Sequence, residues 1–474
     1  MNRSLRRDLY AVGAAVLLVT AAVLVGRPIQ DKVLAGWPPL LASWDPHVGP
    51  GTPAAVLVAA ATVAYGPALA ARLPWRALLP LAWGTATAWI FSLALVDGWH
   101  RGVARRLTTR YEYLQVIDRF HDIPATLRTF TGHILIGSPD NWPPHVAGHP
   151  PAATLTFVLL DRIGLRGGGW AGVWCICVGA TACVAVLVTL RALADERLAR
   201  RAAPFLVLAP AAVWMGTSAD AYFAAVAAWA VALLALAVTG RSLWWAGASG
   251  LLSGLTCYLS YGLTLIALVA AAVLLLGRRG VRERPVLLVP LLAGLAVVPA
   301  VFTLAGFDWW EAYRLLVTRY HQGAGGTRPY GYWVWANLAC TVCITGLATV
   351  AGVRRVGGGL WGAGVGARGA GAGPRGVGAG AREVGGRLRR GGAGVFRGLS
   401  SGPEVRLCVL VAAALLALLV ADLSGMSKAE TERIWLPFAV WLLPACALLG
   451  GARAWLAAQA VLALLLNHLL LTVW

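Results

Sequence analysis

Apolar runs of about 20 residues recur along the whole chain and constrain its fold more than any other feature. An α-helix rises about 1.5 Å per residue, so a run of this length crosses the roughly 30 Å hydrocarbon layer of a bilayer. We count about thirteen such runs. They lie near residues 9 to 26, 52 to 71, 77 to 96, 168 to 190, 203 to 218, 220 to 239, 243 to 259, 262 to 277, 285 to 305, 332 to 352, 405 to 422, 434 to 450 and 454 to 472. The sequence predicts an all-α polytopic membrane protein with about thirteen transmembrane helices.

The composition excludes an ordinary soluble protein. Mean hydropathy is +0.70, and charged residues make up 13% of the chain, whereas soluble proteins carry about 25%. The first apolar run follows Arg3, Arg6 and Arg7 and resembles a secretory signal peptide, but no small-residue cleavage site comes after it. We expect this run to be retained as the first helix.

The net charge of +20 is concentrated in one segment and does not indicate a nucleic-acid partner. Ten arginines and two acidic residues lie between Arg354 and Arg406, in a stretch dominated by glycine. Such a stretch lacks the apolar residues that form a core, so we expect a disordered cytoplasmic loop at 354–404. It is either a solvated linker or a segment attracted to anionic lipid headgroups.

The arginines also predict the orientation of the helices. Clusters of arginine alternate along successive apolar runs, at residues 3–7, 72–76, 191–201, 278–284 and 354 onward. The positive-inside rule makes that side cytoplasmic, with the N-terminus inside a bacterial plasma membrane. Seven of the eight histidines, all except His468, fall on the other side, as do most acidic residues. We therefore expect any chemistry at the extracytoplasmic face.

This topology divides the chain into five parts: three helices in 1–96, an extracytoplasmic catalytic loop in 97–167, a central bundle in 168–353 with an outer loop at 306–331, the loop at 354–404, and the final helices in 405–474. Within the catalytic loop, Glu112 to Phe130 can form an amphipathic helix. A second helix, Pro150 to Arg162, starts with proline and is too short to span easily, so we expect it on the membrane surface, ending near Gly164.

Three short motifs lie on the predicted outer face: Glu112-Tyr113-Leu114, Gly148-His149-Pro150-Pro151 and Glu432-Arg433-Ile434-Trp435. With the many helices and the long acid-bearing loop, they resemble the GT-C glycosyltransferases, in an actinobacterial branch related to the protein mannosyltransferase and aminoarabinose transferase-like families. The resemblance implies a polyprenyl-phosphate sugar donor, an inverting displacement, and a glycan, lipid or protein acceptor in the cell envelope.

A carboxylate in the catalytic loop is the expected base. A sugar attached to phosphate already has a good leaving group, so the enzyme needs a base for the acceptor hydroxyl and cations for the departing phosphate. We expect Glu112 to be the base. Familiar family members carry the acid after the first helix, often as an Asp-Glu pair, whereas here the loop follows the third helix and Glu112 is a single acid. Asp118 and Asp122 are therefore alternatives. The flanking Tyr111 and Tyr113 would pack on sugar faces or lower the polarity around the acid. The alternative for Glu112 is a solvated loop carboxylate.

Cations for the phosphate are expected from two segments. His145 and His149 lie in the catalytic loop, and Lys428 and Arg433 precede a late helix on the same predicted side. A guanidinium suits bidentate binding of phosphate, although Lys428 and Arg433 are also placed to snorkel at the membrane interface beside Trp435. No cofactor is expected with certainty. A divalent metal held by the two histidines and an acid is the alternative to loop orientation or phosphate binding by His149.

Further polar residues at the outer helix ends are expected to bind substrate: Asp220, Tyr222, Tyr320, His321, Glu430 and Glu432. Asp220 is the most informative, because an acid between two apolar spans is unfavourable without a role. The pairs Cys175-x-Cys177 and Cys340-x-x-Cys343 lie inside apolar runs and are expected to pack rather than to bind metal.

Other classes of function remain open. A transporter or lipid flippase would place ionisable residues at mid-membrane on broken helices, often within inverted repeats, whereas here the charges gather outside. A non-catalytic assembly subunit would tolerate replacement of Glu112. Membrane acyltransferases and other lipid-processing enzymes would also use histidine and acid on an outer face.

Overall fold

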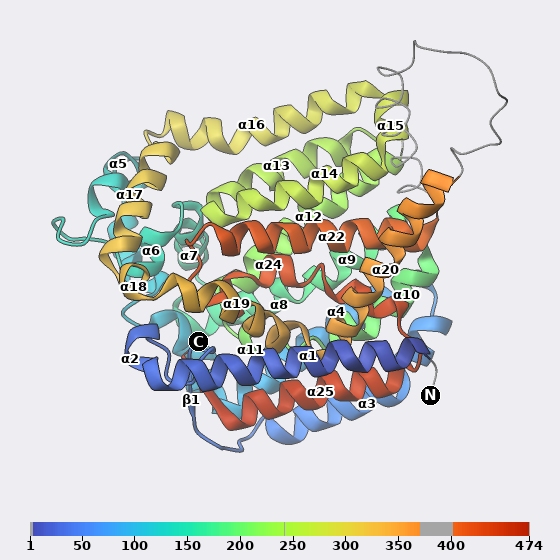
Figure 1. Ribbon diagram of the computed structural model, residues 1–474. Coiled ribbons are helices and arrows are strands. Elements are labelled where there is room, and N and C mark those ends of the chain that lie inside the picture. Colours follow the sequence, from blue (N-terminus) through green and yellow to red (C-terminus); the bar gives the residue numbers. More distant parts are fainter. Residues whose placement is uncertain (1–2, 241, 370–401, 474) are drawn as a thin grey trace, which may run out of the picture.

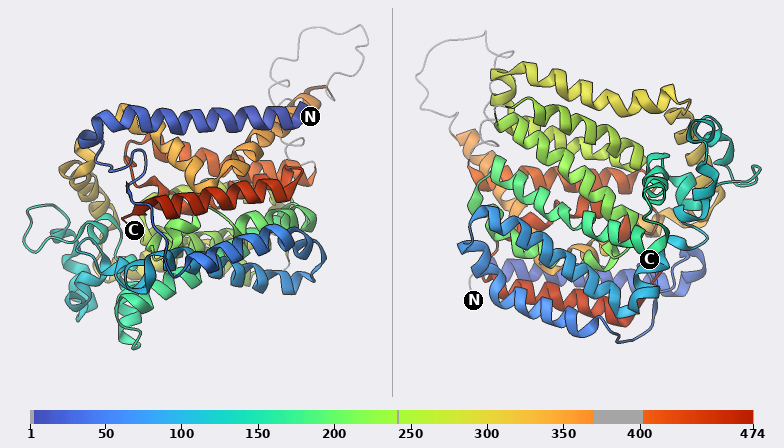
Figure 2. Two further views of the ribbon diagram at one scale, coloured as in Figure 1. Left: turned by 90° about the horizontal axis from the view of Figure 1, so that it is seen from below. Right: turned by 180° about the vertical axis from the view of Figure 1, so that it is seen from behind.

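The computed structural model describes residues 3–240, 242–369 and 402–473. Its long helices lie roughly side by side, and the first and last described residues lie at opposite ends of the bundle (Figure 1). We call the end where the chain begins the basic end. The opposite end, which holds most of residues 97–167, we call the loop end. Two further views show the same separation (Figure 2).

Eight helical segments are long and apolar enough to cross a membrane, or nine if one bent pair counts as a single span, among the residues the structure describes. The eight are α1 (Arg3–Gly26) continued by η1 (Arg27–Ile29) and α2 (Gln30–Val33); α3 (Thr52–Arg72); α4 (Trp75–Ala94) with η2 (Leu95–Asp97); α8 (Gly167–Gly179) with α9 (Thr181–Leu193); α12 (Ala219–Thr239); η8 (Pro285–Leu287) with α16 (Leu288–Leu304); α22 (Pro403–Leu423); and α25 (Ala452–Leu469). The bent pair is α19 (Tyr330–Thr345) and α20 (Leu347–Gly369), with an angle of 111° between its two parts.

The expected count of about thirteen spans is therefore too high if a span must be a helix long enough to cross the bilayer. The other expected spans form shorter or interrupted helices: α10 (Glu196–Val207) with α11 (Ala212–Met215), α13 (Trp244–Leu259), η7 (Tyr261–Ile266) with α14 (Ala267–Leu276), and α24 (Leu436–Ala439) with η9 (Leu443–Leu448). The 16 residues of α13 rise only about 24 Å. These segments are apolar because they pack within the bundle, so hydropathy alone does not separate them from full spans.

The loop end holds the remaining helices. They are η3 (His100–Ala104), η4 (Arg106–Thr108), η5 (Tyr113–Phe120), α5 (Ile123–Thr129), η6 (Phe130–His133), α6 (Pro144–Gly148), α7 (Ala152–Arg162), α17 (Trp309–Gln322), α18 (Ala324–Thr327) and α23 (Thr431–Ile434). At the basic end, α15 (Arg278–Glu283) joins α14 to η8. The expected outer loop at 306–331 thus contains two helices.

The prediction of a single amphipathic helix from Glu112 to Phe130 is wrong, because the segment divides into η5 and α5. The Asp122 carboxylate accepts a hydrogen bond from the Ala125 amide (3.0 Å), so it caps a new helix in which Pro124 occupies the first turn. The short helix expected after Pro150 is present as α7. It is followed by Gly164, whose φ of +90° is a conformation that favours glycine.

Two strands qualify the all-α expectation. β1 (Ala42–Trp44) pairs antiparallel with β2 (Leu470–Thr472) at the loop end. Next to this pairing, the His47 amide donates to the His468 carbonyl (2.8 Å). His468 therefore lies beside His47 at the loop end, which corrects the expectation that it falls on the opposite side from the other seven histidines.

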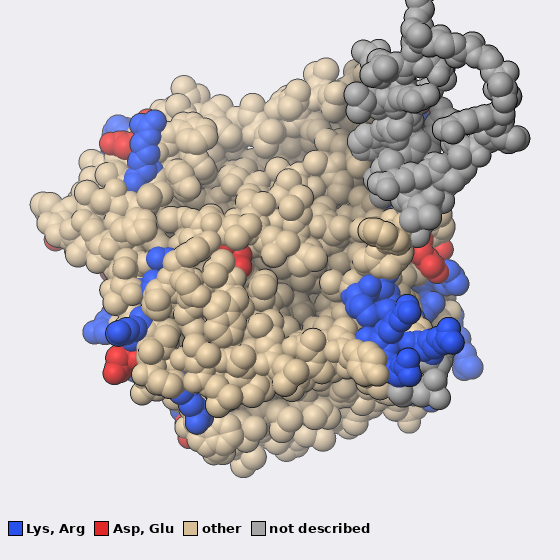
Figure 3. Space-filling model, in the orientation of Figure 1, with Lys and Arg blue, Asp and Glu red and all other residues tan. Residues whose placement is uncertain are grey.

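The arginine clusters assigned to one side do meet at the basic end. Arg200 donates to the carbonyls of Ala70 and Leu73, where α3 ends, and Arg355 forms an ion pair with Asp8 of α1 (2.6 Å). A broad uncharged band separates this basic surface from the mixed charges of the loop end (Figure 3). This pattern fits a bundle that crosses a bilayer.

The Gly/Arg-rich segment is partly helical. The loop expected at 354–404 begins inside α20, which continues to Gly369. Residues 370–401 lie outside the described part of the chain. At the centre of the bundle, α12 is the most enclosed of the eight long helical segments, with 78% of the residues in its most apolar stretch buried. Its first turn reaches the loop end and carries Asp220.

Candidate functional site

A buried group of charged side chains lies at the loop end. We call it the charged cluster, and it consists of Glu112, His145, Asp220, Arg328, Glu430 and Arg433. Its members come from the segment 97–167, the first turn of α12, the residue pair before α19 and the segment around α23. The structure thus joins segments more than 300 positions apart in the sequence, such as Glu112 and Arg433.

Arg433 is the centre of the charged cluster. Its side chain is 4% exposed, and Nη1 donates to Asp220 Oδ2 at 2.7 Å. Nη2 lies 3.3 Å from His145 Nε2 and 3.4 Å from Glu430 Oε2. Burial opposes the charge of Arg433, but the nearby Asp220 and Glu430 outweigh burial and raise its pKa above the ordinary value. The guanidinium is therefore charged at every physiological pH.

His145 connects Glu112 to Arg433. Its Nδ1 lies 2.8 Å from Glu112 Oε1, within ion-pair distance, although the ring N–H is not aligned as in a regular hydrogen bond. Because a guanidinium has no acceptor atom, Nε2 of His145 must accept from Arg433, and the proton of a neutral ring then sits on Nδ1, facing Glu112. The second carboxylate oxygen, Glu112 Oε2, is buried and has no hydrogen-bond partner among the described residues.

His149 holds the turn between α6 and α7. Its Nδ1 lies 2.7 Å from the His145 carbonyl oxygen, which requires a proton on Nδ1, and 3.1 Å from the Tyr113 hydroxyl. Burial lowers the pKa of His149 to about 4, although Asp220 acts in the opposite direction. His149 is therefore neutral at pH 7, which favours orientation of the loop over binding of phosphate as a cation.

A strained turn carries Glu430 toward the arginines. Ala429 and Glu430 have φ values of 68° and 62°, a left-handed conformation that is unfavourable by roughly 1–2 kcal/mol for each residue other than glycine. Arg328 Nη1 donates to the Lys428 carbonyl (2.9 Å) and lies 3.2 Å from Glu430 Oε1. Burial raises the pKa of Glu430, but Arg433 and Arg328 outweigh burial, so the pKa is below its ordinary value.

Arg328 is a member of the cluster that sequence reasoning missed. Arginines mainly mark the cytoplasmic side of a membrane protein, so its residue type alone did not indicate a site. The available signal was its position: an arginine just before Pro329 and α19, in the loop at 306–331 predicted to be extracytoplasmic, which also holds Arg314 and Arg319. Arginines on this side run against the positive-inside pattern, which indicates a role other than membrane orientation.

Several predicted site residues lie near the cluster but bond elsewhere. Lys428 Nζ donates to the Gly325 carbonyl (2.9 Å), and the Lys428 amide donates to the Tyr320 hydroxyl (3.1 Å). Tyr222 shares a hydrogen bond with Thr156 (2.8 Å) on α7. These side chains support the walls of the charged cluster.

Other predicted site residues lie apart from the cluster. Asp118, Asp122 and His321 are exposed, and Asp122 serves as the cap of α5. Tyr111 is 43% exposed and has the Arg110 guanidinium 4.8 Å from its ring centre. The structure therefore separates Glu112 from the alternative acids, because Glu112 is 7% exposed and contacts charged partners.

The described residues contain no group of three His, Cys, Asp or Glu side chains arranged to hold a metal ion. His145 and His149 interact through a backbone carbonyl, and His145 directs its ring nitrogens toward Glu112 and Arg433. Cys175, Cys340 and Cys343 are buried within α8 and α19.

The burial of Glu432 should make the stability of the protein depend on pH. Its Oε1 accepts a hydrogen bond from the Leu41 amide (2.9 Å), while burial raises the pKa of Glu432 from its ordinary value near 4.5 to about 7. Between these two values the folded chain binds more protons than the unfolded chain, so stability falls as pH rises through this window. We expect a loss on the order of 1–3 kcal/mol between about pH 5 and about pH 8.

Thermal unfolding in detergent across that pH range measures this effect. The Glu432→Gln variant should lose much of the slope, because it no longer titrates. Glu311→Gln, which replaces an exposed carboxylate of α17, is the matched control and should retain the wild-type slope. Equal slopes for wild type and Glu432→Gln would refute the assignment.

Comparison of the sequence with protein-family models and with curated proteins finds no match. Among solved structures, the chain resembles the oligosaccharyltransferase from Archaeoglobus fulgidus in its complex with zinc and sulfate, with a TM-score of 0.36 and 14% sequence identity. The match covers 77% of this chain and 47% of the archaeal chain, so the protein spans about half the length of that relative. A likeness with this TM-score establishes neither the fold nor the function of the chain.

Proposed function

We propose that the protein is a membrane glycosyltransferase that moves a sugar from a polyprenyl-phosphate donor to a cell-envelope acceptor at the loop end. The observation that carries the proposal is the contact of Glu112 with His145 and of His145 with Arg433, in one buried cluster. A base and a guanidinium side by side are the two groups that transfer from a sugar phosphate requires. The three sequence motifs that resemble the GT-C glycosyltransferases each contribute a residue at or beside this cluster.

In this proposal Glu112 is the base. Its Oε1 faces His145, and the buried Oε2 is the oxygen that would accept a proton from the acceptor hydroxyl. The His145 ring, with Nδ1 at 2.8 Å from Oε1, would hold the carboxylate in place. The acceptor oxygen then attacks the anomeric carbon, the bond from that carbon to the phosphate oxygen breaks, and the polyprenyl phosphate leaves with the electron pair.

Arg433 and Arg328 would bind the departing phosphate. Both guanidiniums are buried and held in place by Glu430, which lies between them. A cation that is fixed before the reaction stabilises developing negative charge without reorganisation. The acids that surround Arg433 also prevent a buried cation from being unpaired before the donor binds.

Location at the extracytoplasmic face belongs to the same proposal. The arginine clusters meet at the basic end, so the positive-inside rule directs the loop end outward. A polyprenyl-phosphate sugar can reach that face through the membrane, whereas a soluble nucleotide sugar stays in the cytoplasm.

Purified protein in lipid, supplied with radiolabelled polyprenyl-phosphate mannose, arabinose or glucose and envelope extract as acceptor, tests the proposal. We expect label from one donor to appear in the acceptor, and no label from the corresponding nucleotide sugars. Absence of transfer from every donor, together with substrate-dependent flux in sealed vesicles, would replace the proposal with a transporter or flippase.

A further inference from the structure

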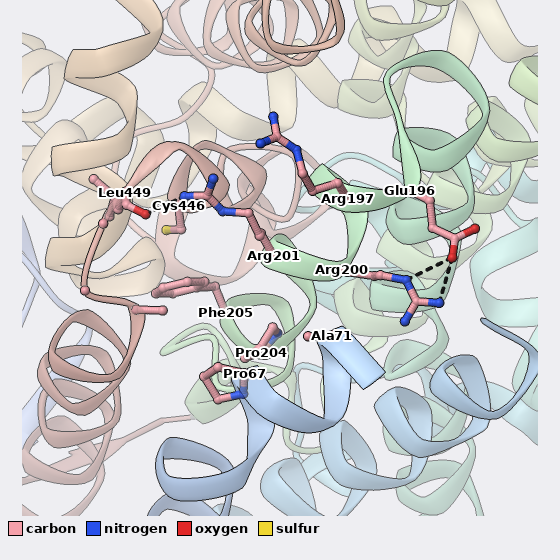
Figure 4. A pocket seen from close by; sticks show the side chains of 13 residues that line it. Pro67, Ala71, Glu196, Arg197, Arg200, Arg201, Pro204, Phe205, Cys446 and Leu449 are labelled. Atoms are coloured by element: carbon pink, nitrogen blue, oxygen red, sulfur yellow. Dashed lines mark hydrogen bonds and ion pairs between the residues drawn. The ribbon is translucent and has the colours of Figure 1, made fainter. Parts of the chain in front are cut away.

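A second candidate binding site lies at the basic end, away from the charged cluster. It is a cavity of about 540 Å³ between α3, α10 and the junction of η9 with α25, which we call the basic pocket. Its volume is within the range of small-ligand sites. The pocket is lined by Pro67, Ala71, Glu196, Arg197, Arg200, Arg201, Pro204, Phe205, Cys446, Leu449, Gly450, Gly451 and Ala452 (Figure 4).

The sequence explains why a cavity forms here. Pro67 and Pro204 lie inside α3 and α10, where proline removes a backbone hydrogen bond and hinders close helical packing. Gly450 and Gly451 join η9 to α25, and Gly451 has a φ of +71°. Two helices that contain proline and a glycine junction without side chains leave space that larger residues would otherwise fill.

Three arginines from one turn of α10 line the pocket, and they differ in their partners. Arg200 points away from the pocket to Glu196 and closes the end of α3 (Figure 4). Arg201 points across the pocket and donates to the Leu449 carbonyl (2.7 Å). Arg197 contacts Glu404 at 3.4 Å, with side-chain exposures of 64% and 60%. The side chains of Arg197 and Arg201 are therefore accessible, and nearby acids neutralise their charges only weakly.

The surroundings of Arg201 favour a negative ligand. Burial lowers the pKa of Arg201, and the charges of Arg197 and Arg355 lower it further, while Glu404 acts in the opposite direction. Like charges held close together repel, and an anion between them would relieve that repulsion. Guanidinium groups are also the side chains best shaped to bind phosphate oxygens in pairs.

Apart from the arginines and Glu196, which pairs with Arg200, the lining is mostly apolar and indicates the source of the anion. Phe205, Pro204 and Leu449 offer no hydrogen-bonding side chain to a sugar or a base, so a nucleotide would gain little beyond its phosphate. An amphiphile fits both parts, with its phosphate at the arginines and its apolar portion along the pocket wall. We propose that the basic pocket binds the phosphate headgroup of an anionic phospholipid.

Native mass spectrometry of the full chain in detergent, titrated with phosphatidylglycerol or phosphatidylcholine, tests this proposal. We expect preferential retention of one phosphatidylglycerol. The double variant Arg197→Gln/Arg201→Gln should weaken retention about thirtyfold, from the loss of two basic groups near the headgroup. Arg279→Gln is the matched control, because it removes an exposed arginine at the same end of the bundle, and it should bind as the wild type does.

The single variant Arg197→Gln keeps the test decisive if the double variant does not fold, because the Arg197 side chain is largely exposed. Equal binding of phosphatidylcholine, or wild-type retention of phosphatidylglycerol by Arg197→Gln and the double variant, would overturn the proposal. Competition by glycerol 3-phosphate at millimolar concentration would overturn the lipid assignment while preserving a phosphate site. None of these outcomes depends on the glycosyltransferase activity proposed for the opposite end.

Discussion

Replacing Glu112 with glutamine should reduce sugar transfer by roughly 10²–10⁴-fold, the usual contribution of a positioned general base. Glutamine has nearly the same shape, so it can still contact His145, but it cannot take the proton of the acceptor hydroxyl. The loss should therefore appear in kcat, with little change in the KM of the lipid donor. Transfer rates at saturating donor, measured for wild type and variant in the same lipid, give this comparison.

Asp118→Asn is the matched control for Glu112→Gln. It removes a carboxylate from the same segment of the chain, but the side chain is exposed and lies outside the charged cluster. Transfer by Asp118→Asn should remain close to the wild-type rate. The base assignment fails if Glu112→Gln retains activity, or if Asp118→Asn loses activity to the same extent.

Replacing Arg433 with methionine should lower the free energy of unfolding by about 3–5 kcal/mol, because it leaves buried acids without their cation. Asp220 loses a contact of 2.7 Å in surroundings that exclude water, and its side chain is 4% exposed. The second acid, Glu430, keeps its contact with Arg328, so Asp220 should account for most of the effect. Thermal unfolding in detergent at pH 7 measures the change.

A second substitution separates charge from packing. In the double variant Arg433→Met/Asp220→Asn the uncompensated charge is removed, so part of the lost stability should return, as a double-mutant cycle detects. Arg279→Gln breaks an exposed ion pair with Glu283 and should leave the unfolding temperature almost unchanged. If the double variant is no more stable than Arg433→Met alone, an uncompensated Asp220 is not the cause.

The residues that meet in the charged cluster were largely accessible from the sequence. Glu112 and His145 were predicted in the outer loop at 97–167, and Asp220 and Arg433 at the outer ends of apolar runs. The arginine clusters predicted which ends share a side, and in a bundle of side-by-side helices residues on one side are restricted to a small area. The contacts among these four residues agree with that reasoning.

Other features depended on interactions that a sequence pattern does not encode. The periodicity from Glu112 to Phe130 suits one helix, yet the hydrogen bond of the Asp122 carboxylate begins a second one. The length of a helix inside the bundle depends on its neighbours, which is why apolar character overestimated the number of spans. The pairing of β1 with β2 joins residues 42–44 to 470–472, a separation at which local propensity carries no information.

The enclosure of α12 has a consequence for how a substrate could reach the charged cluster. Asp220 belongs to a helix with packed neighbours on most sides, so displacing it would disturb the whole bundle. Glu112 immediately precedes the short helix η5, and His145 lies in the five-residue helix α6; both side chains are buried. If the proposed function holds, a lipid donor should therefore reach the cluster through a rearrangement of residues 97–167, because moving α12 would disturb more of the packed bundle.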